Sequence, residues 1–327
     1  PPRSTLFPYT TLFRSYKKIF RGNSKYFCLF KPESLYKRFI KEHYDVIVSY
    51  LEGPTARIVS GCNDKDTKLV SWIHIEQHTE KALSASFRNF DEAKKCYNKF
   101  DNTVCVSEYV KNDFVNILNF KKPIEVLYNT NETNDICRLA NDEENTQMMS
   151  DDETNICIVG KVHIRKGCDR ICHIQKRLKS EGFNTHIYFL GVGPDENFVK
   201  DFAKENNLES SITLLGYQTN PYKYVKKCDL FVCASLAEGF STATTEALIL
   251  GTPVVTVEVS GMKEMLGDNN EYGIVTENNE DALYEGIKKI LTEENLLQHY
   301  KKQAIVRGQR FSTEKTVKAV EEMFLSI

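Results

Sequence analysis

The segment 229–257 constrains the fold more than any other part of the sequence. An apolar run at 229–234 is followed by a Gly-containing turn, a helix-compatible stretch that stops at Gly251, and a second apolar run from Pro253. Apolar runs of this length are typical of buried strands, and Gly is a common helix stop. The order strand, turn, helix, strand predicts a βαβ unit with a parallel sheet.

Two carboxylates flank the start of this helix, Glu238 in the turn and Glu246 inside the helix. The first N–H groups, near Ser241 and Thr242, and the positive end of the helix dipole favour a phosphate. Gly239 lets a ligand approach the backbone. Because carboxylates accept hydrogen bonds from ribose and hexose hydroxyls, the pattern indicates a nucleotide-sugar site. An ordinary βαβ crossover with two solvated acids is the alternative interpretation.

These residues resemble the signature of the retaining GT-B glycosyltransferases of family 4, the glycosyl transferases group 1. That signature has two Glu residues eight positions apart and then Gly-x-Pro-Val-Val, as at Glu238, Glu246 and 251–255. The resemblance covers about residues 44–327 and is strongest over 156–270. It implies an α/β protein of the GT-B fold, with two Rossmann-like domains whose parallel sheets face a cleft.

A basic segment at 160–167, Gly-Lys-Val-His-Ile-Arg-Lys-Gly, joins a strand end to a helix. Cations there can hold a diphosphate and stabilise the charge that grows on it as the sugar leaves. The family usually has an Arg and a Lys five positions apart; here Lys161 replaces the Arg, and Lys166 matches. Because Lys lacks the bidentate fork of Arg, Arg165 is expected to compensate. Solvated basic residues at a strand–helix junction are the alternative.

The resemblance also implies a role for each candidate residue. The catalytic residues would be His74, Lys166 and Glu238. The donor diphosphate would be bound by Lys161, Arg165, Lys166, Gly239, Ser241 and Thr242. The donor sugar would be bound by Glu238, Gly239 and Phe240, with Gly239 and its neighbours acting through the backbone. Glu246 would bind the ribose, and Tyr217 the base.

His74 ends the strand predicted at 68–74. In the family a His after this strand reaches towards the donor diphosphate and sugar, where it positions and polarises rather than abstracts a proton. A lone His beside apolar residues is otherwise more often a core or surface group.

Strands and helices alternate along the rest of the chain. In the first half, strands are expected at 45–50, 68–74, 103–106 and 124–128, and helices at 34–43, 54–60, 87–99 and 108–119. In the second half, strands are expected at 156–160, 185–191, 211–215, 230–234, 253–257 and 273–276. Residues 129–155 are rich in Asn, Asp, Glu and Thr, which predicts a solvated linker. The expected domains are therefore 16–150, on the acceptor side, and 151–327, for the donor.

Residues 1–15, PPRSTLFPYTTLFRS, show no periodicity and resemble translated vector sequence, so we expect a non-native artefact. The Gly-rich first βα unit of the family is not recognisable, so the N-terminal domain is expected to be truncated. Residues 16–44 carry eight Lys or Arg against two Glu, among aromatics. Such a surface suits peripheral contact with an anionic membrane. Core residues laid bare in an incomplete domain are the competing interpretation.

Composition and short motifs argue against nucleic-acid, metal and dinucleotide binding. A hydrophobic content of 41% and a net charge of −2 are those of a globular protein without a basic nucleic-acid footprint. The ten cysteines are scattered through apolar runs, which favours reduced thiols and a cytoplasmic protein. Asp64 and Asp66 have the form of an Asp-x-Asp metal site, but their polar loop suggests solvation. Gly191-Val-Gly193 predicts a tight turn rather than a dinucleotide site.

The resulting hypothesis is a retaining hexosyltransferase that needs neither metal nor cofactor. It would move a hexose from a nucleoside diphosphate sugar to a glycan or lipid-linked acceptor in cell-surface polysaccharide synthesis. Among such donors, a UDP-sugar is the favoured expectation. It would act in the cytoplasm, with possible peripheral contact at the inner face of the membrane. Two alternatives stay open: another GT-B enzyme such as a nucleotide-sugar epimerase, and a non-catalytic fragment that still binds nucleotide.

Overall fold

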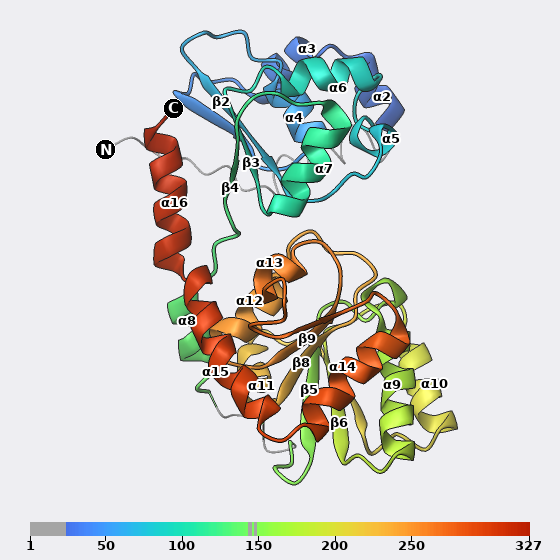
Figure 1. Cartoon of the computed structure of the whole chain (residues 1–327). Helices are drawn as coiled ribbons and strands as arrows, with labels where there is room; N and C mark the ends of the chain where they lie inside the picture. Colours follow the sequence, from blue (N-terminus) through green and yellow to red (C-terminus); the bar gives the residue numbers. More distant parts are fainter. Residues whose placement is uncertain (1–23, 143–145, 147–148) are drawn as a thin grey trace. The chain divides into compact units, whose positions relative to one another are not determined.

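The computed structural model describes residues 24–142, 146 and 149–327 (Figure 1). They form two compact units. The first ends at Val126 and also takes in Leu325–Ile327, and the second spans Leu127–Phe324. The unit boundary therefore lies before the acidic segment, whereas the sequence placed it between residues 150 and 151.

The sheet of the first unit has four parallel strands in the order β1-β2-β3-β4. Val48 lies opposite Val70, and Trp72 opposite Val104. The strands are β1 (Val46–Ser49), β2 (Lys68–Ile73), β3 (Asn102–Cys105) and β4 (Ile124–Val126). The helices are α2 (Ser24–Leu29), α3 (Pro32–Phe39), α4 (Pro54–Val59), α5 (Glu80–Leu83), α6 (Phe90–Tyr97) and α7 (Glu108–Leu118).

A buried arginine ties the first described helix to this unit. Arg57 donates to the carbonyl of Phe27 at 2.9 Å and pairs with Glu92 at 3.0 Å. Its guanidinium lies 5.2 Å from the Phe27 ring, which is itself buried. Within the basic, aromatic segment, Phe27 thus belongs to the core; Phe20 and the other residues before 24 lie outside the described part.

The sheet of the second unit has six parallel strands in the order β10-β9-β8-β5-β6-β7. Its first strand lies in the middle, and the chain fills one half of the sheet before the other, as in Rossmann folds. The strands are β5 (Thr154–Val159), β6 (Thr185–Leu190), β7 (Ile212–Gly216), β8 (Leu230–Cys233), β9 (Val254–Val257) and β10 (Ile274–Thr276).

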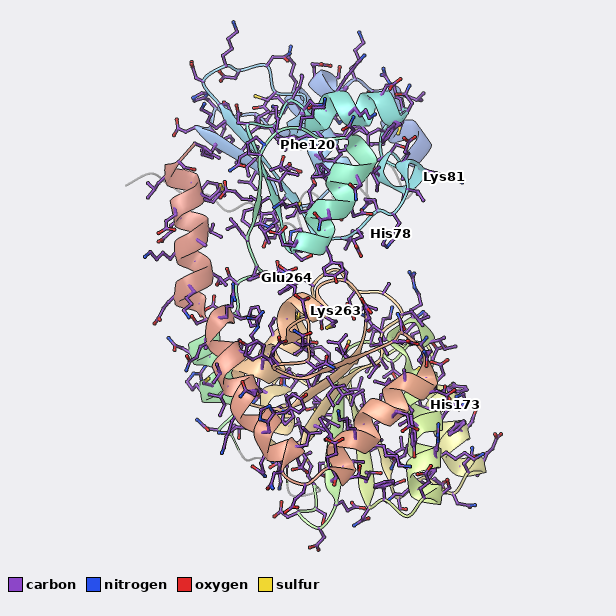
Figure 2. All side chains as sticks on the ribbon, viewed as in Figure 1. His78, Lys81, Phe120, His173, Lys263 and Glu264 are labelled. Atoms are coloured by element: carbon purple, nitrogen blue, oxygen red, sulfur yellow. The ribbon has the colours of Figure 1, made fainter. Side chains whose placement is uncertain are left out.

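Helices cover both faces of this second sheet (Figure 1). On one face lie α9 (Cys168–Ser180), α10 (Glu196–Glu205) and α14 (Glu280–Thr292); on the other lie α8 (Thr133–Leu139), α11 (Tyr222–Lys227), α12 (Thr242–Ile249) and α15 (Leu296–Gly308). The remaining elements are α13 (Met262–Leu266), α16 (Thr313–Leu325) and the short 3₁₀ turns η1 (Ile164–Lys166) and η2 (Gln309–Phe311). His173 of α9, labelled in Figure 2, contacts Glu280 of α14 at 2.9 Å, which links two helices of one face.

Each strand expected from the sequence is present within a few residues of its predicted bounds. Ser107 caps α7 as predicted, because its side chain accepts the N–H of Val110 at 3.1 Å. The expected solvated linker is wrong in part: residues 133–139 form α8, which packs on α11 and α12. Ile136 is buried there, so tertiary packing stabilises a helix that the polar composition of the segment does not favour.

All ten cysteines lie in the described part of the chain, where they are free thiols and mostly buried. None of the described helices combines the length and apolar character needed to cross a lipid bilayer.

Candidate functional site

The candidate donor site lies where the strand order of the second sheet reverses. β5 pairs with β8 on one side and with β6 on the other. The loops after β5 and β8 consequently lead in opposite directions and leave a crevice at the carboxyl edge of the sheet, where α/β proteins bind ligands. These two loops carry the basic segment and the first acid of the sequence motif. They are joined by a hydrogen bond from the N–H of Leu236 to the carbonyl of Arg165, at 3.0 Å.

Gly167 sets how closely the two loops approach. Its φ is +75°, and a Cβ atom placed there would lie 2.2 Å from the carbonyl oxygen of Ala234. Only glycine combines this backbone angle with this contact. The preceding turn is held by Asp195, which accepts the N–H of Ile164 at 2.8 Å, and by His163, which accepts that of Arg165 at 2.9 Å. The basic segment therefore presents its side chains from a fixed backbone.

Glu238 is the centre of the site. Its Oε1 atom lies 2.6 Å from Nζ of Lys166, and the hydroxyl of Ser235 donates to the same oxygen at 2.6 Å. The Glu238 side chain is 14% exposed and Ser235 is buried. Two donors on one oxygen fix the carboxylate and leave Oε2 as the acceptor available to a ligand. The structure thus brings Lys166 and Glu238 together, as the sequence predicted for one site.

A hollow of about 330 Å³ adjoins this pair. It is lined by Lys161, His163, Arg165, Lys166 and Ala237. Lys161 and Arg165 are exposed. A cation-lined hollow at the end of a parallel sheet suits an anionic group such as a diphosphate.

Ser241 caps the helix that follows. Its hydroxyl accepts the N–H of Thr244 at 3.3 Å, and α12 begins at Thr242. The first N–H groups of a helix lack intrahelical partners and carry the positive end of its dipole. The N-terminus of α12 can therefore contribute backbone donors to an anion, as the sequence indicated.

Glu246 lies half-buried on α12. Burial raises the pKa of its carboxyl above the ordinary value, and a hydrogen bond from the Tyr222 hydroxyl opposes that shift. The Tyr222 oxygen is 3.3 Å from Glu246 Oε1. Burial also raises the pKa of Tyr222 to about 12, so this hydroxyl stays protonated and donates at neutral pH. Glu246 is thus a partly buried acceptor with one oxygen already engaged.

Phe240 and Tyr217 occupy contrasting places. Phe240 is buried and stacks on Tyr128, with ring centroids 5.1 Å apart and planes 12° from parallel, so a donor sugar would meet its backbone. Tyr217 follows β7 and is 74% exposed. The turn expected at Gly191 and Gly193 is confirmed as structural, because a Cβ on either would lie within 2 Å of a backbone oxygen.

His74 belongs to the first unit. It follows β2, and its backbone N–H donates to Glu52 Oε2 at 3.0 Å. The ring packs edge-on against Tyr50 with centroids 4.9 Å apart. Burial lowers the pKa of His74, which favours the neutral ring near pH 7.

Asp64 and Asp66 lie in a turn of the same unit. Asp64 accepts the N–H of Asp66 at 3.0 Å and contacts His43 at 2.7 Å. These contacts make up a local polar turn. Within the described ranges, no group of three or more His, Cys, Asp or Glu side chains has metal-binding geometry.

Three polar residues beside the predicted ones were missed at the sequence level: Ser235, Tyr222 and Glu52. Ser235 follows an apolar strand and lies three positions before Glu238, so its position relative to that acid was the available signal. Tyr222 begins α11 after an Asn-Pro pair, and nothing in the sequence links it to Glu246. Glu52 follows β1 at the strand edge where His74 follows β2.

Two family models match the chain. The model described as glycosyl transferases group 1 matches residues 141–307, and the model described as Glycosyltransferase Family 4 matches residues 5–134.

Two curated proteins illustrate the sequence similarity. One, from Campylobacter jejuni, is named N-acetylgalactosamine-N,N'-diacetylbacillosaminyl-diphospho-undecaprenol 4-alpha-N-acetylgalactosaminyltransferase. The chain is 33% identical to it over 196 residues, which cover 59% of this chain and 51% of that protein. The other is an uncharacterized glycosyltransferase of Methanocaldococcus jannaschii. The chain is 25% identical to it over 352 residues, which cover 96% of this chain and 83% of that protein.

Solved structures share the fold. HepE of Anabaena, crystallised with UDP, aligns with a TM-score of 0.72 at 16% identity over 90% of this chain and 81% of HepE. TarM of Staphylococcus aureus aligns with a TM-score of 0.68 at 19% identity over 89% of this chain and 57% of TarM. Both units thus have the Rossmann-like architecture of GT-B glycosyltransferases. With more than half of its length matched by one family model, the chain belongs to the glycosyl transferases group 1, of the family 4 type.

Proposed function

We propose that the chain is a retaining, metal-independent glycosyltransferase that transfers a hexose from UDP-hexose to a glycan or lipid-linked acceptor in cell-surface polysaccharide synthesis. The observation that carries the proposal is the Lys166–Glu238 pair, 2.6 Å apart, beside a cation-lined hollow. A half-buried acid next to a cationic hollow matches the two halves of a sugar diphosphate.

Each residue then has a physical task. Lys161, Arg165 and Lys166, with the N-terminus of α12, hold the diphosphate and stabilise the negative charge that grows on it as the glycosidic bond breaks. Glu238 accepts hydroxyl groups of the hexose through Oε2, and Glu246 accepts those of the ribose. The roles of Tyr217 at the base and of His74 at the donor sugar remain predictions.

The surroundings of Glu238 favour a holding role over a nucleophilic one. A carboxylate oxygen that accepts from both Ser235 and Lys166 is stabilised in place, which lowers its tendency to attack carbon. In the proposed mechanism the acceptor enters on the face from which the diphosphate leaves, and the departing phosphate oxygen takes the acceptor proton. The sugar configuration is then retained.

The names of related proteins support the choice of substrates. The Campylobacter relative is named for a diphospho-undecaprenol acceptor, and HepE was crystallised with UDP-glucose. A UDP-linked donor and a lipid-linked acceptor are therefore the first substrates to examine.

The test is transfer from a panel of UDP-hexoses and UDP-N-acetylhexosamines to polyprenyl-diphosphate glycans, with the product anomer read by NMR. We expect transfer with retention, and loss of turnover in Lys166→Ala but not in Lys179→Ala, a change on α9 outside the site. An inverted product would contradict the retaining mechanism. Free UDP with an altered donor sugar and no transfer would favour an epimerase.

A further inference from the structure

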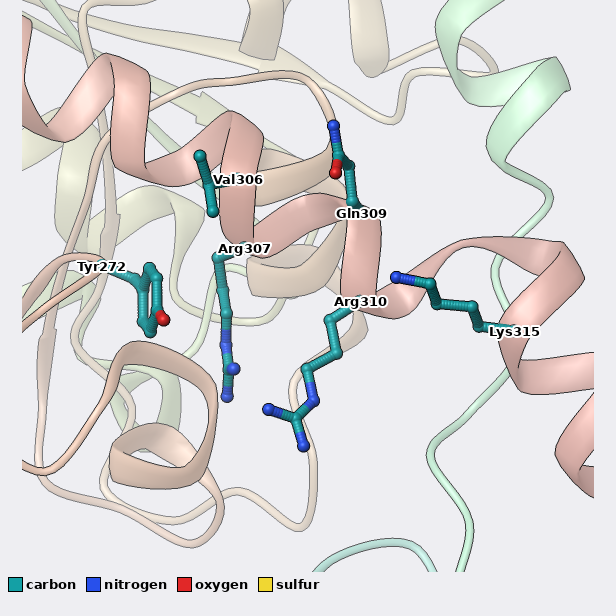
Figure 3. Close-up of a pocket in the computed structure, with 6 residues that line it drawn as sticks. All are labelled: Tyr272, Val306, Arg307, Gln309, Arg310 and Lys315. Atoms are coloured by element: carbon teal, nitrogen blue, oxygen red, sulfur yellow. The ribbon is translucent and has the colours of Figure 1, made fainter.

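A second hollow of about 410 Å³ lies in the second unit, and its lining is also cationic (Figure 3). The lining residues are Tyr272, Val306, Arg307, Gln309, Arg310 and Lys315. They come from the end of α15, from η2, from the start of α16 and from the loop before β10. None of them lines the donor hollow.

Arg307 is built into the wall of this hollow. It is 8% exposed, and its Nε donates to the carbonyl of Met265 at 2.7 Å, while an Nη atom donates to the carbonyl of Glu264. Its guanidinium also lies 4.8 Å from the Tyr272 ring. Burial and the nearby charge of Arg310 both lower the pKa of Arg307. A rigid cation thus sits beside a second cation at a cost in electrostatic free energy.

Protein carboxylates offset this cluster only from a distance: the charges of Glu264 and Glu271 act on Arg307 without a close ion pair. In the described ranges, no Asp or Glu oxygen pairs within 4.0 Å with Arg307, Arg310 or Lys315. Both acids also accept hydrogen bonds from other groups: Glu264 accepts the hydroxyl of Tyr128 at 2.8 Å, and Glu271 accepts the N–H of Asn269 at 3.0 Å.

Interaction with the negative end of a helix does not explain the positions of all three cations. Arg307, in the last turn of α15, would by itself suit the negative end of that helix. Arg310 and Lys315 lie beyond the helix, and their side chains extend towards the same hollow in Figure 3. A ligand with several anionic oxygens can engage two guanidinium forks and an ammonium at once.

We propose that this hollow is an anion site for a phosphate monoester, separate from the donor site. Arg307 and Arg310 would bind phosphate oxygens through their forks, and Lys315 would neutralise the second charge. The phosphate group can come from a soluble molecule or from a lipid headgroup. The inference rests on the cluster itself and not on the proposed transferase activity.

The first arm of the test is calorimetric titration with inorganic phosphate at constant ionic strength. It uses the Lys161→Ala/Lys166→Ala background, in which the donor hollow has lost two cations. We expect Arg310→Gln/Lys315→Gln to weaken phosphate binding about tenfold or more, because two charged hydrogen-bond donors are lost. Arg307 is left in place, since it also holds two backbone carbonyls.

The matched control is Lys302→Gln/Lys318→Gln, which removes two charges from α15 and α16 outside the hollow. The second arm is sedimentation with phosphatidylcholine vesicles, with and without phosphatidic acid. Phosphate binding lost only in Arg310→Gln/Lys315→Gln supports a soluble ligand, and loss of phosphatidic acid binding supports a headgroup. The proposal is overturned if Arg310→Gln/Lys315→Gln binds phosphate and phosphatidic acid as its parent protein does. It is also overturned if the control variant loses as much binding.

Discussion

At the residue scale, Ser235 shows how the site positions its central acid. Its hydroxyl donates to Glu238 Oε1, so Ser235→Ala removes one of two bonds that orient the carboxylate. We expect turnover to fall about tenfold, as for loss of one hydrogen bond to a charged group, with UDP affinity unchanged. Steady-state kinetics and UDP calorimetry measure the two quantities.

The control for this change is Ser180→Ala, which removes an exposed hydroxyl at the end of α9. Equal losses of turnover and UDP affinity in Ser235→Ala would indicate general damage to the site. Unchanged turnover would remove Ser235 from the positioning of Glu238.

The pKa of Glu246 gives a prediction on pH. Only the ionised carboxylate accepts two ribose hydroxyls, and burial raises its pKa, so UDP affinity should fall on acidification at a higher pH than for an ordinary Glu. Tyr222 stabilises the ionised form, so Tyr222→Phe should move this loss to still higher pH. UDP titrations across the acidic range test this, with Tyr109→Phe on α7 as control. The same pH profile in Glu246→Gln as in wild type would contradict the assignment.

The candidate site could be predicted from the sequence as far as its charged residues. Glu238, Lys161 and Lys166 follow two strands of one sheet, so the topology alone brings them near each other. Tyr222 could not be predicted, and Ser235 only from its place three residues before Glu238, because the contact that each hydroxyl makes depends on the direction of its side chain. Phe240 is the opposite case: a residue in the motif whose side chain belongs to an aromatic core contact.

At the scale of the element, Gly167 joins the loop after β5 to the end of β8. Gly167→Ala should destabilise the protein by roughly 2 kcal/mol or more beyond the cost of its positive φ, because the new methyl group would overlap the Ala234 carbonyl. Gly182→Ala is the matched control: its φ is +87° and nothing lies within 4 Å of the added Cβ. Urea unfolding of the two variants gives the difference, and equal free energies of unfolding would refute the packing argument.

The strands could be predicted because apolar runs of four to six residues, separated by helical stretches, have few other folded solutions. The helix α8 could not, since its Asn, Asp and Arg residues give no apolar stripe. It is stabilised by tertiary contacts: Ile136 is buried, and the N–H of Thr133 donates to the hydroxyl of Thr313 at 2.9 Å, far along the chain. Such contacts are not encoded in local composition.

At the scale of the whole molecule, the two-unit organisation was predicted, but its boundary was not. The segment after Val126 joins the second unit through side chains: Asn131 lies buried between α12 and η2, where its Oδ1 accepts the Thr245 hydroxyl at 3.3 Å. A polar segment can therefore belong to a domain when its amides satisfy buried groups.

The proposed metal independence is also tested at the scale of the whole molecule. If the cations of the donor hollow replace a divalent ion, extensive dialysis against EDTA should leave the transfer rate unchanged. The rate before and after dialysis, with Mn²⁺ and Mg²⁺ added back, checks this. A rate abolished by EDTA and restored by Mn²⁺ would direct attention to Asp64 and Asp66.

The proposed donor pocket in the second unit is tested most directly by calorimetric titration of the full chain with UDP. Wild type should bind UDP, Glu246→Ala should bind it about tenfold or more weakly through loss of the ribose hydrogen bonds, and Glu285→Ala, an exposed change on α14, should bind it as wild type does. Equal UDP affinity in Glu246→Ala and wild type would contradict the assignment of this pocket.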